Sequence, residues 1–306
     1  MALKSSGFCD IGINKPLAGH PKKHPGAALR RYGAESMPVK DIALPASHQT
    51  DIEFLTVDGV KLEAKRFPGS AGKPTLVFLH EGLGCIDMWW DFPARLSYIN
   101  GCPALVYSRR GYGRSAPCDI PRPLTYMHYE GLEVLPDLLK TAETADHVLI
   151  GHSDGGSIAL INAGGAPAPG LKAVITMAAH VFCETLSVTS IAQAKTLYEE
   201  ADLRSRLAKY HLDNVDGAFW GWNKAWLDPE FMRWNIQEYL PKIIVPQLVM
   251  QGYDDPYGTI AQVEAIERLS AGPVKVRMLK NCGHSPYKDQ AQKSLEAASD
   301  FISRIE

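Results

Sequence analysis

The chain has 306 residues, of which 45% are hydrophobic and 22% are charged, so it can bury a large core and is not disordered by composition. Its 32 Lys and Arg nearly balance 34 Asp and Glu, and the net charge of −2 argues against a nucleic-acid binder, which usually carries a basic face. No apolar run approaches the ~18 residues of a membrane span, and the runs present are the size of a strand.

Residues 1–48 differ from the rest of the chain. They hold 7 Lys or Arg against 3 Asp or Glu, with scattered Gly and Pro and no clear period. We expect an extension that is draped on the surface or disordered, with a targeting peptide or an oligomerisation arm as alternatives. This segment contains no run resembling the apolar part of a signal peptide, and the 6 cysteines form no C-x-x-C pair. These features favour free thiols and a cytoplasmic setting.

From about residue 50 the pattern alternates between strands and helices. Residues 51–57 and 61–67 are predicted to form a hairpin with Asp58-Gly59 as its turn. The apolar runs that follow are nearly continuous, as in parallel strands covered on both faces, and span 75–80, 103–108, 147–153, 171–179, 246–252 and 274–280. Helical periodicity appears over 129–145, 155–163 and 290–305. The pattern predicts an α/β fold with a mostly parallel, doubly wound sheet.

A stretch without good strands interrupts this alternation over residues 181–241. It contains helical periodicity in 191–198 and 203–210, followed by a tryptophan-rich segment. We expect a helical lid inserted into a core made of residues 49–180 and 242–306. Its tryptophans are expected to pack onto the core, or to form an aromatic ceiling over an apolar ligand group. Candidates for lining such a pocket are Trp220 and Trp222, together with Trp89 after an earlier strand.

The strand predicted over 147–153 runs into the sequence Gly151-His152-Ser153-Asp154-Gly155, and a helix is predicted to follow. A G-x-S-x-G pattern between a strand and a helix places the serine on a tight turn, where bulk two residues to either side would collide with neighbouring backbone. The pattern alone is common in a chain with this many glycines. Its strand–turn–helix context is what predicts Ser153 as a nucleophile.

A serine nucleophile needs a base and an acid that orients the base. His284 follows the last predicted strand, and Asp254 and Asp255 follow the strand before it. All of these lie at carboxyl ends of predicted strands, where open α/β sheets build their sites. The glycine-rich loop Glu81–Gly84 follows another strand and can turn backbone N–H groups toward a reacting carbonyl oxygen, with the N–H of Asp154 as a second donor.

Together these motifs resemble the lid-bearing α/β-hydrolases of the esterase, lipase and C–C hydrolase type over residues 50–306. The motifs that carry the resemblance are His80–Gly84, Ser108–Ser115, Gly151–Gly155, Gly252–Asp255 and Gly283-His284. The resemblance implies Ser153 as nucleophile, Asp255 as acid and His284 as base. It also implies an oxyanion hole made by the N–H groups of Gly82 and Asp154, and no organic cofactor.

Some positions depart from the family pattern. Glu81 stands where a glycine is common, which puts a carboxylate near the pocket. A serine nucleophile argues against haloalkane dehalogenases and epoxide hydrolases, and His152 and Asp154 replace the Asn and Met usual in C–C hydrolases. No H-E-x-x-H spacing occurs, so His80, His152 and His180 are expected to be structural and no metal site is predicted.

These observations predict a serine hydrolase that cleaves a small or medium carboxylic ester through an acyl-enzyme. The alternatives are a C–C bond or lactone hydrolase with the same triad, and a ligand receptor of the same fold with little turnover. The expected partner is a small-molecule ester or related carbonyl compound, with neither nucleic acid nor a membrane span involved. No oligomeric state follows from the sequence.

Overall fold

The computed structural model describes residues 43–305, so the extension predicted over residues 1–48 lies almost wholly outside the described part. An eight-stranded sheet forms the centre, in the order β1-β2-β4-β3-β5-β6-β7-β8. Its strands are β1 (Glu53–Val57), β2 (Val60–Phe67), β3 (Thr75–Leu79), β4 (Ala104–Tyr107), β5 (His147–His152), β6 (Leu171–Met177), β7 (Gln247–Gly252) and β8 (Val274–Leu279).

The sheet is antiparallel only at one edge. β1 pairs with β2 as a hairpin and β2 pairs antiparallel with β4, whereas all pairs from β4 to β8 are parallel. Every residue of β5, β4 and β7 is buried, which explains their continuous apolar sequences. The predicted mostly parallel, doubly wound sheet is confirmed.

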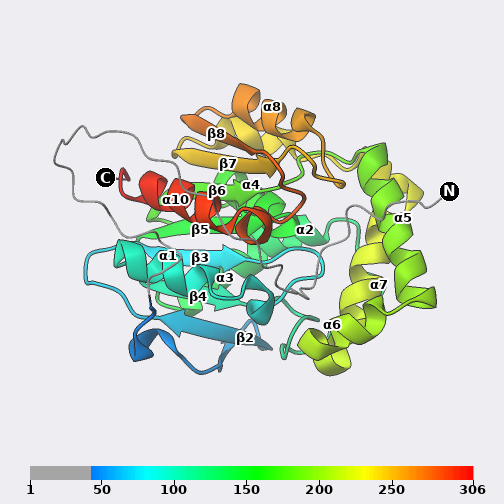
Figure 1. Cartoon of the computed structure of the whole chain (residues 1–306), viewed down its shortest axis with the longest axis horizontal. Helices are drawn as coiled ribbons and strands as arrows, with labels where there is room; N and C mark the ends of the chain where they lie inside the picture. The colour runs from blue at the N-terminus through cyan, green and yellow to red at the C-terminus, as the bar shows by residue number, and fades with distance from the viewer. Residues whose placement is uncertain (1–42, 306) are drawn as a thin grey trace, which may run out of the picture.

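Helices cover both faces of the sheet (Figure 1). One face is covered by α1 (Phe92–Asn100), α9 (Pro286–Asp289) and α10 (Ala291–Ile302), whose buried side chains form one hydrophobic cluster with residues of β3, β4 and β5. The other face is covered by α4 (Asp154–Gly165) and α8 (Ile260–Leu269), which belong to a second and larger cluster. Short 3₁₀ turns lie at η2 (Ala46–His48) and η3 (Ile86–Trp89).

The helix predicted over 129–145 forms in three pieces. They are α2 (Tyr126–Tyr129), a π-helical turn η4 (Glu130–Val134) and α3 (Leu135–Thr141). Pro136 has no N–H to give to the carbonyl four residues before it, so the regular α-helical pattern cannot continue through this point. The helix also ends before residue 145, because Glu143 adopts a left-handed backbone conformation with φ of 53°.

A helical segment is inserted between β6 and β7. It comprises α5 (Thr185–Glu200), α6 (Leu203–His211) and α7 (Val215–Trp226), which we call the inserted helices, and the 3₁₀ turns η5 (Leu212–Asn214), η6 (Pro229–Arg233) and η7 (Gln237–Lys242). In Figure 1 the inserted helices stand together beyond the end of the sheet toward which the parallel strands point. Their buried side chains, including Ile191, Phe219 and Trp226, belong to the same cluster as α4.

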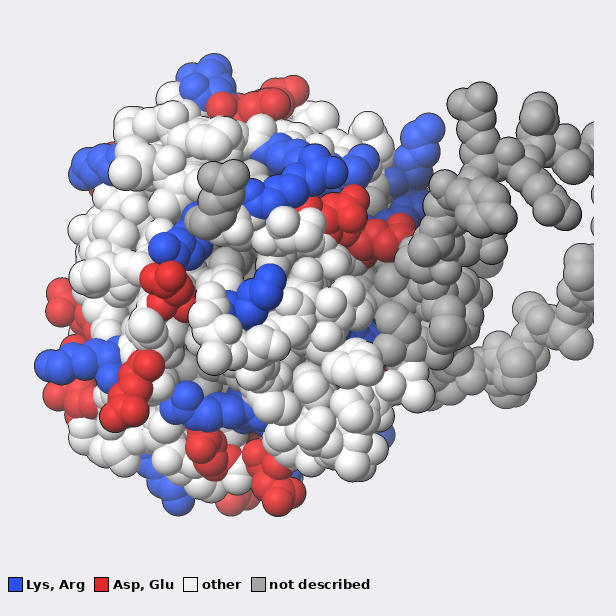
Figure 2. Space-filling view, turned by 90° about the vertical axis from the view of Figure 1, so that its left-hand side faces the viewer, with Lys and Arg blue, Asp and Glu red and all other residues white. Residues whose placement is uncertain are grey.

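The surface carries charge of both signs. On the face shown in Figure 2, Lys and Arg groups lie beside Asp and Glu groups, with uncharged surface between them. Among residues 43–305, no helix combines the length and the apolar character that crossing a membrane requires.

Candidate active site

The turn between β5 and α4 carries Ser153 in a strained conformation, with φ of 52°. The backbone around it is tightly packed. A Cβ on Gly151 would lie 2.2 Å from the carbonyl oxygen of Gly155, and a Cβ on Gly155 would lie 2.0 Å from that of Leu79. Only glycine fits at either position, which is the steric reason for the spacing of the G-x-S-x-G sequence. Asp154 begins α4, so its N–H belongs to the first helical turn and has no partner within the helix.

Ser153, His284 and Asp255 are hydrogen-bonded in a line. The Nε2 atom of His284 lies 2.9 Å from the Ser153 hydroxyl, and its Nδ1 atom lies 2.9 and 3.0 Å from the two carboxylate oxygens of Asp255. Because a carboxylate accepts hydrogen bonds, Nδ1 carries the proton and Nε2 presents its lone pair to the serine. Asp255 is buried and also accepts from the N–H of Tyr257 at 2.9 Å, whereas the neighbouring Asp254 is exposed.

Electrostatics reinforce this arrangement. Burial by itself lowers the pKa of His284, but the adjacent Asp255 carboxylate outweighs burial, and the pKa is raised above its ordinary value. Burial by itself raises the pKa of Asp255, and the His284 imidazole overcomes it, so this carboxyl has a lowered pKa and stays ionised. The imidazole is therefore a stronger base than an isolated histidine, and its partner remains an anion.

A small cavity lies beside Ser153, between the sheet and the inserted helices. Its volume is about 30 Å³. It is lined by the loop after β3, by residues next to the strand ends and by three residues of the inserted helices, namely Glu81, Gly82, Leu83, Ser153, His180, Tyr257, His284, Ile191, Trp222 and Trp226. This space is about the size of one water molecule, and an organic substrate requires its walls to move.

Of the tryptophans predicted to line a pocket, Trp222 lies in the cavity wall and two lie elsewhere. Trp89 is 1% exposed and packs against Phe78, Phe92 and Tyr287 on the opposite face of the sheet. Trp220 is half-buried and contacts Tyr198 within the inserted helices. The helical period explains the difference, since residues two apart on α7 point in different directions.

The loop after β3 is anchored to the elbow of Ser153 by buried polar groups. Arg109 is fully buried, donates to the carbonyl of Glu81 at 2.8 Å and lies 4.0 Å from the Asp154 carboxylate. The Tyr126 hydroxyl donates to the same carboxylate, and the Trp226 indole donates to that hydroxyl at 3.0 Å. Among the described residues no hydrogen bond uses the N–H of Gly82. The N–H groups of Gly82 and Asp154 are thus both available beside the cavity.

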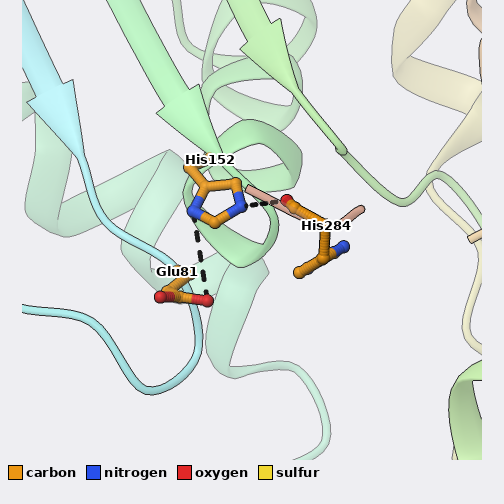
Figure 3. Close-up of side chains that lie close together, drawn as sticks. All are labelled: Glu81, His152 and His284. Atoms are coloured by element: carbon orange, nitrogen blue, oxygen red, sulfur yellow. Dashed lines mark hydrogen bonds and ion pairs between the residues drawn. The ribbon is translucent and has the colours of Figure 1, made fainter. Parts of the chain in front are cut away.

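His152 lies between Glu81 and the backbone carbonyl of His284 (Figure 3). Its Oε2 atom lies 4.0 Å from Nδ1 of His152, while Nε2 of His152 lies 2.6 Å from the carbonyl oxygen of His284. Burial lowers the pKa of His152 to about 4. Burial by itself raises the pKa of Glu81, but the nearby His152, Lys288 and His284 lower it overall. The imidazole of His152 is therefore neutral at neutral pH, and its Nδ1 atom faces the carboxyl group of Glu81.

Five of the lining residues were not predicted from the sequence as pocket residues: Leu83, which lies inside the predicted glycine-rich loop, and His180, Ile191, Trp226 and Tyr257. His180 had a usable signal, because it follows β6 and so lies at the same sheet edge as Ser153. Tyr257 lies two residues after Asp255 in the same loop. The other two belong to the inserted helices, whose orientation toward the cavity depends on tertiary packing that the sequence pattern does not contain.

Comparisons with known proteins agree with this architecture. The sequence profile of the alpha/beta hydrolase family matches residues 76–297. The fold is similar to an esterase from Exiguobacterium antarcticum, with 18% identity and a TM-score of 0.65 over 82% of this chain and 98% of that one. It is also similar to an enol-lactonase from Burkholderia xenovorans, with 20% identity and a TM-score of 0.64 over 82% of this chain and the whole of that one.

A local sequence match adds a third relative. A stretch of 66 residues is 35% identical to the thiohydrolase aneE of Aspergillus aculeatus. It covers 22% of this chain and spans only 21% of the length of that protein. The family profile covers most of the present chain, and the fold and the strand–turn–helix elbow agree with it. The chain therefore belongs to the alpha/beta hydrolase family.

Proposed function

We propose that this protein is a serine hydrolase that cleaves a small or medium carboxylic ester through an acyl-enzyme. The observation that carries the proposal is the hydrogen-bonded line from Asp255 through His284 to Ser153. In this mechanism the Ser153 hydroxyl gives its proton to Nε2 of His284 as its oxygen attacks the ester carbonyl. Asp255 holds the imidazole in the required tautomer and stabilises the imidazolium that forms.

The tetrahedral intermediate places negative charge on the former carbonyl oxygen. We assign the N–H groups of Gly82 and Asp154 to stabilise it, a contribution worth roughly 3–4 kcal/mol for a donor of this kind. His284 then returns its proton to the leaving alcohol. A water molecule, deprotonated by the same Nε2 atom, attacks the acyl-enzyme and releases the acid and free Ser153.

The inserted helices are proposed to act as a lid that sets substrate specificity. Trp222, Trp226 and Ile191 line the cavity on the side of the inserted helices, so a substrate that enters must displace these side chains. The second candidate substrate class is a lactone or a thioester, because an enol-lactonase and a thiohydrolase are among the similar proteins. Both bonds present a carbonyl to the same serine, so a panel of esters, lactones and thioesters separates the candidates.

Fluorophosphonate labelling tests the mechanism directly. The reagent should modify Ser153 alone, as located by peptide mass, and Ser153→Ala should abolish both labelling and nearly all turnover, by about 10⁶-fold in kcat. Ser157 is a matched control, because it is a buried serine one helical turn further along α4. Labelling of Ser157 in the wild type, or near-normal hydrolysis by folded Ser153→Ala, contradicts a Ser153 nucleophile. A ligand receptor would be labelled but would show no turnover after the first acylation.

A further inference from the structure

Glu81 and His152 face each other, but no hydrogen bond joins their side chains. Both residues are buried, at 6% and 0% exposed. Nδ1 of His152 and Oε1 of Glu81 have no hydrogen-bond partner among the described residues. Nε2 of His152 donates to the carbonyl of His284, so Nδ1 offers a lone pair, and it faces the carboxylate across 4.0 Å. Two acceptors that face each other in a buried site leave a place for a group that both can bind, namely a proton, a water molecule or a cation.

A ring nitrogen of His284 completes the group. Within the described residues, one ligand atom from each of Glu81, His152 and His284 lies within 4.8 Å of the others. Nδ1 of His284 is engaged by Asp255, so the nitrogen available to a ligand is Nε2. Figure 3 shows the three side chains converging from the loop after β3, the end of β5 and the loop that carries His284.

The hydrogen bonds behind the two imidazoles match those of metal-binding histidines. Such histidines donate their second N–H to a carboxylate or a backbone carbonyl, which fixes the tautomer and the ring orientation. His152 donates to the His284 carbonyl, and His284 donates to the Asp255 carboxylate. Each ring therefore has an unprotonated nitrogen, Nδ1 of His152 facing Glu81 and Nε2 of His284 facing Ser153.

We propose that Glu81, His152 and His284 form a binding site for a divalent transition-metal cation of the Zn²⁺ type, and that its occupation switches hydrolysis off. Two imidazoles and one carboxylate suit Zn²⁺ and not Mg²⁺. Metal–ligand distances of about 2.0–2.2 Å put tetrahedral ligand atoms ~3.4 Å apart. The ligand atoms now lie within 4.8 Å of one another, so side-chain rotations that move them by about 1 Å bring them to these distances. Ser153 or a water molecule is placed to supply the fourth ligand.

Inhibition follows from the shared nitrogen. A cation on Nε2 of His284 removes the lone pair that must accept the Ser153 proton, and it occupies the space beside the oxyanion donors. This part rests on the proposed function, whereas cation binding itself does not. Glycine is common at the position of Glu81, and it has no side chain that could bind a cation. A protein with glycine there would therefore lack the third ligand of this site.

Calorimetry with Zn²⁺ on the full chain, stripped of metal with EDTA, tests binding. One site should appear for the wild type, and its affinity should fall at least about tenfold in both Glu81→Gln and His152→Asn. Two matched controls should keep the wild-type affinity. Glu130→Gln alters another buried glutamate with an unpaired oxygen, and His147→Asn alters the histidine at the opposite end of β5. Mg²⁺ should give no heat of binding at the same concentrations.

The rate of fluorophosphonate labelling at Ser153, with and without Zn²⁺, tests the inhibition. Zn²⁺ should slow labelling in proportion to occupancy, and EDTA should restore the rate. Unchanged Zn²⁺ affinity in both Glu81→Gln and His152→Asn, as expected for binding to cysteine thiols, would overturn the proposal, as would saturating Zn²⁺ that leaves labelling unaffected. If one variant fails to fold by circular dichroism, the other decides. Failure of labelling without any metal counts against the proposed function alone, because calorimetry still reports the cation site.

Discussion

Ser153, Asp255 and His284 leave the sheet at the carboxyl ends of β5, β7 and β8, whereas Ile191, Trp222 and Trp226 reach the same cavity from the inserted helices. The first group is fixed by hydrogen bonds to neighbouring strands and loops. The second group is held mainly by apolar packing against the cluster that also contains α4. We therefore expect that substitutions in the first group change the rate of the reaction, whereas substitutions in the second group change which substrates are accepted.

After the loss of Ser153 itself, the largest effect is expected for the proposed acid, Asp255. Asp255→Asn should lower kcat by up to ~10⁴, because an amide in place of the carboxylate favours the wrong tautomer of His284. Asp254→Asn is the matched control, since Asp254 is adjacent but exposed, and it should retain nearly full activity. Steady-state kinetics on both folded variants provide the measurement. The reverse ranking would reassign the acid to Asp254.

A second prediction probes the contact between the two regions. A Cβ on Gly82 would lie 2.3 Å from two atoms of the Trp222 indole, so Gly82→Ala should push the loop and α7 apart. We expect about a 10²-fold loss in kcat/KM from misplaced groups, partly recovered in the Gly82→Ala, Trp222→Ala double variant. Gly217→Ala on the same helix is the control, because its nearest atom would be 3.9 Å away. Additive losses in the double variant would show that Trp222 is not the obstacle.

The pH profile reports on His284. The neutral imidazole is the active base, and Asp255 raises its pKa above the ordinary value of 6.5. Activity should therefore fall about tenfold per pH unit below that raised pKa, with the acid limb of kcat/KM centred above pH 6.5. The residual activity of Asp255→Asn should show this limb at lower pH, while Asp254→Asn should leave it in place. An acid limb below pH 6 in the wild type is the contrary result.

The smallest effect is expected in the inserted helices. Trp222→Ala enlarges the cavity without touching the triad, so longer acyl chains should gain relative to short ones. A change of about tenfold in the ratio of kcat/KM values is reasonable, since each methylene in an apolar pocket is worth ~1–3 kcal/mol. Trp220→Ala is the matched control, because this neighbour lies outside the cavity wall. An equal shift in both variants would mean that the helices act through stability and not through shape.

The same two regions differ in how far the sequence predicts them. The central parallel strands follow from apolar runs, because a parallel sheet buries both faces and leaves a continuous signal. The hairpin of β1 and β2 follows from its Asp58-Gly59 turn, and the elbow follows from its glycine positions. The placement of Asp255 and His284 at strand ends follows from the apolar runs. Helical periodicity also indicates the inserted helices, but it does not say which tryptophan of α7 faces the cavity. The π-helical turn after Tyr129 depends on Pro136 inside a periodic segment, where the apolar pattern continues and hides the break.

Residue spacing in the sequence could not predict that Glu81 and His152 lie next to each other. These residues lie on loops and strand ends that adjoin only because β3 pairs with β5 in the sheet. A search for metal ligands close together in the sequence misses a group assembled from three segments. Such groups are found by asking which side chains share one sheet edge.

The insertion between β6 and β7 also bears on how the chain folds. These two strands are neighbours in the sheet although roughly 70 residues separate them in sequence. Their pairing must wait for a long loop to close, which is a slow, non-local step. Ser153 is synthesised near the midpoint of the chain, while Asp255 and His284 belong to its last fifth. During synthesis the nascent chain therefore carries the proposed nucleophile before the proposed base is made. On the proposed mechanism, hydrolysis can begin only after the final strands have docked.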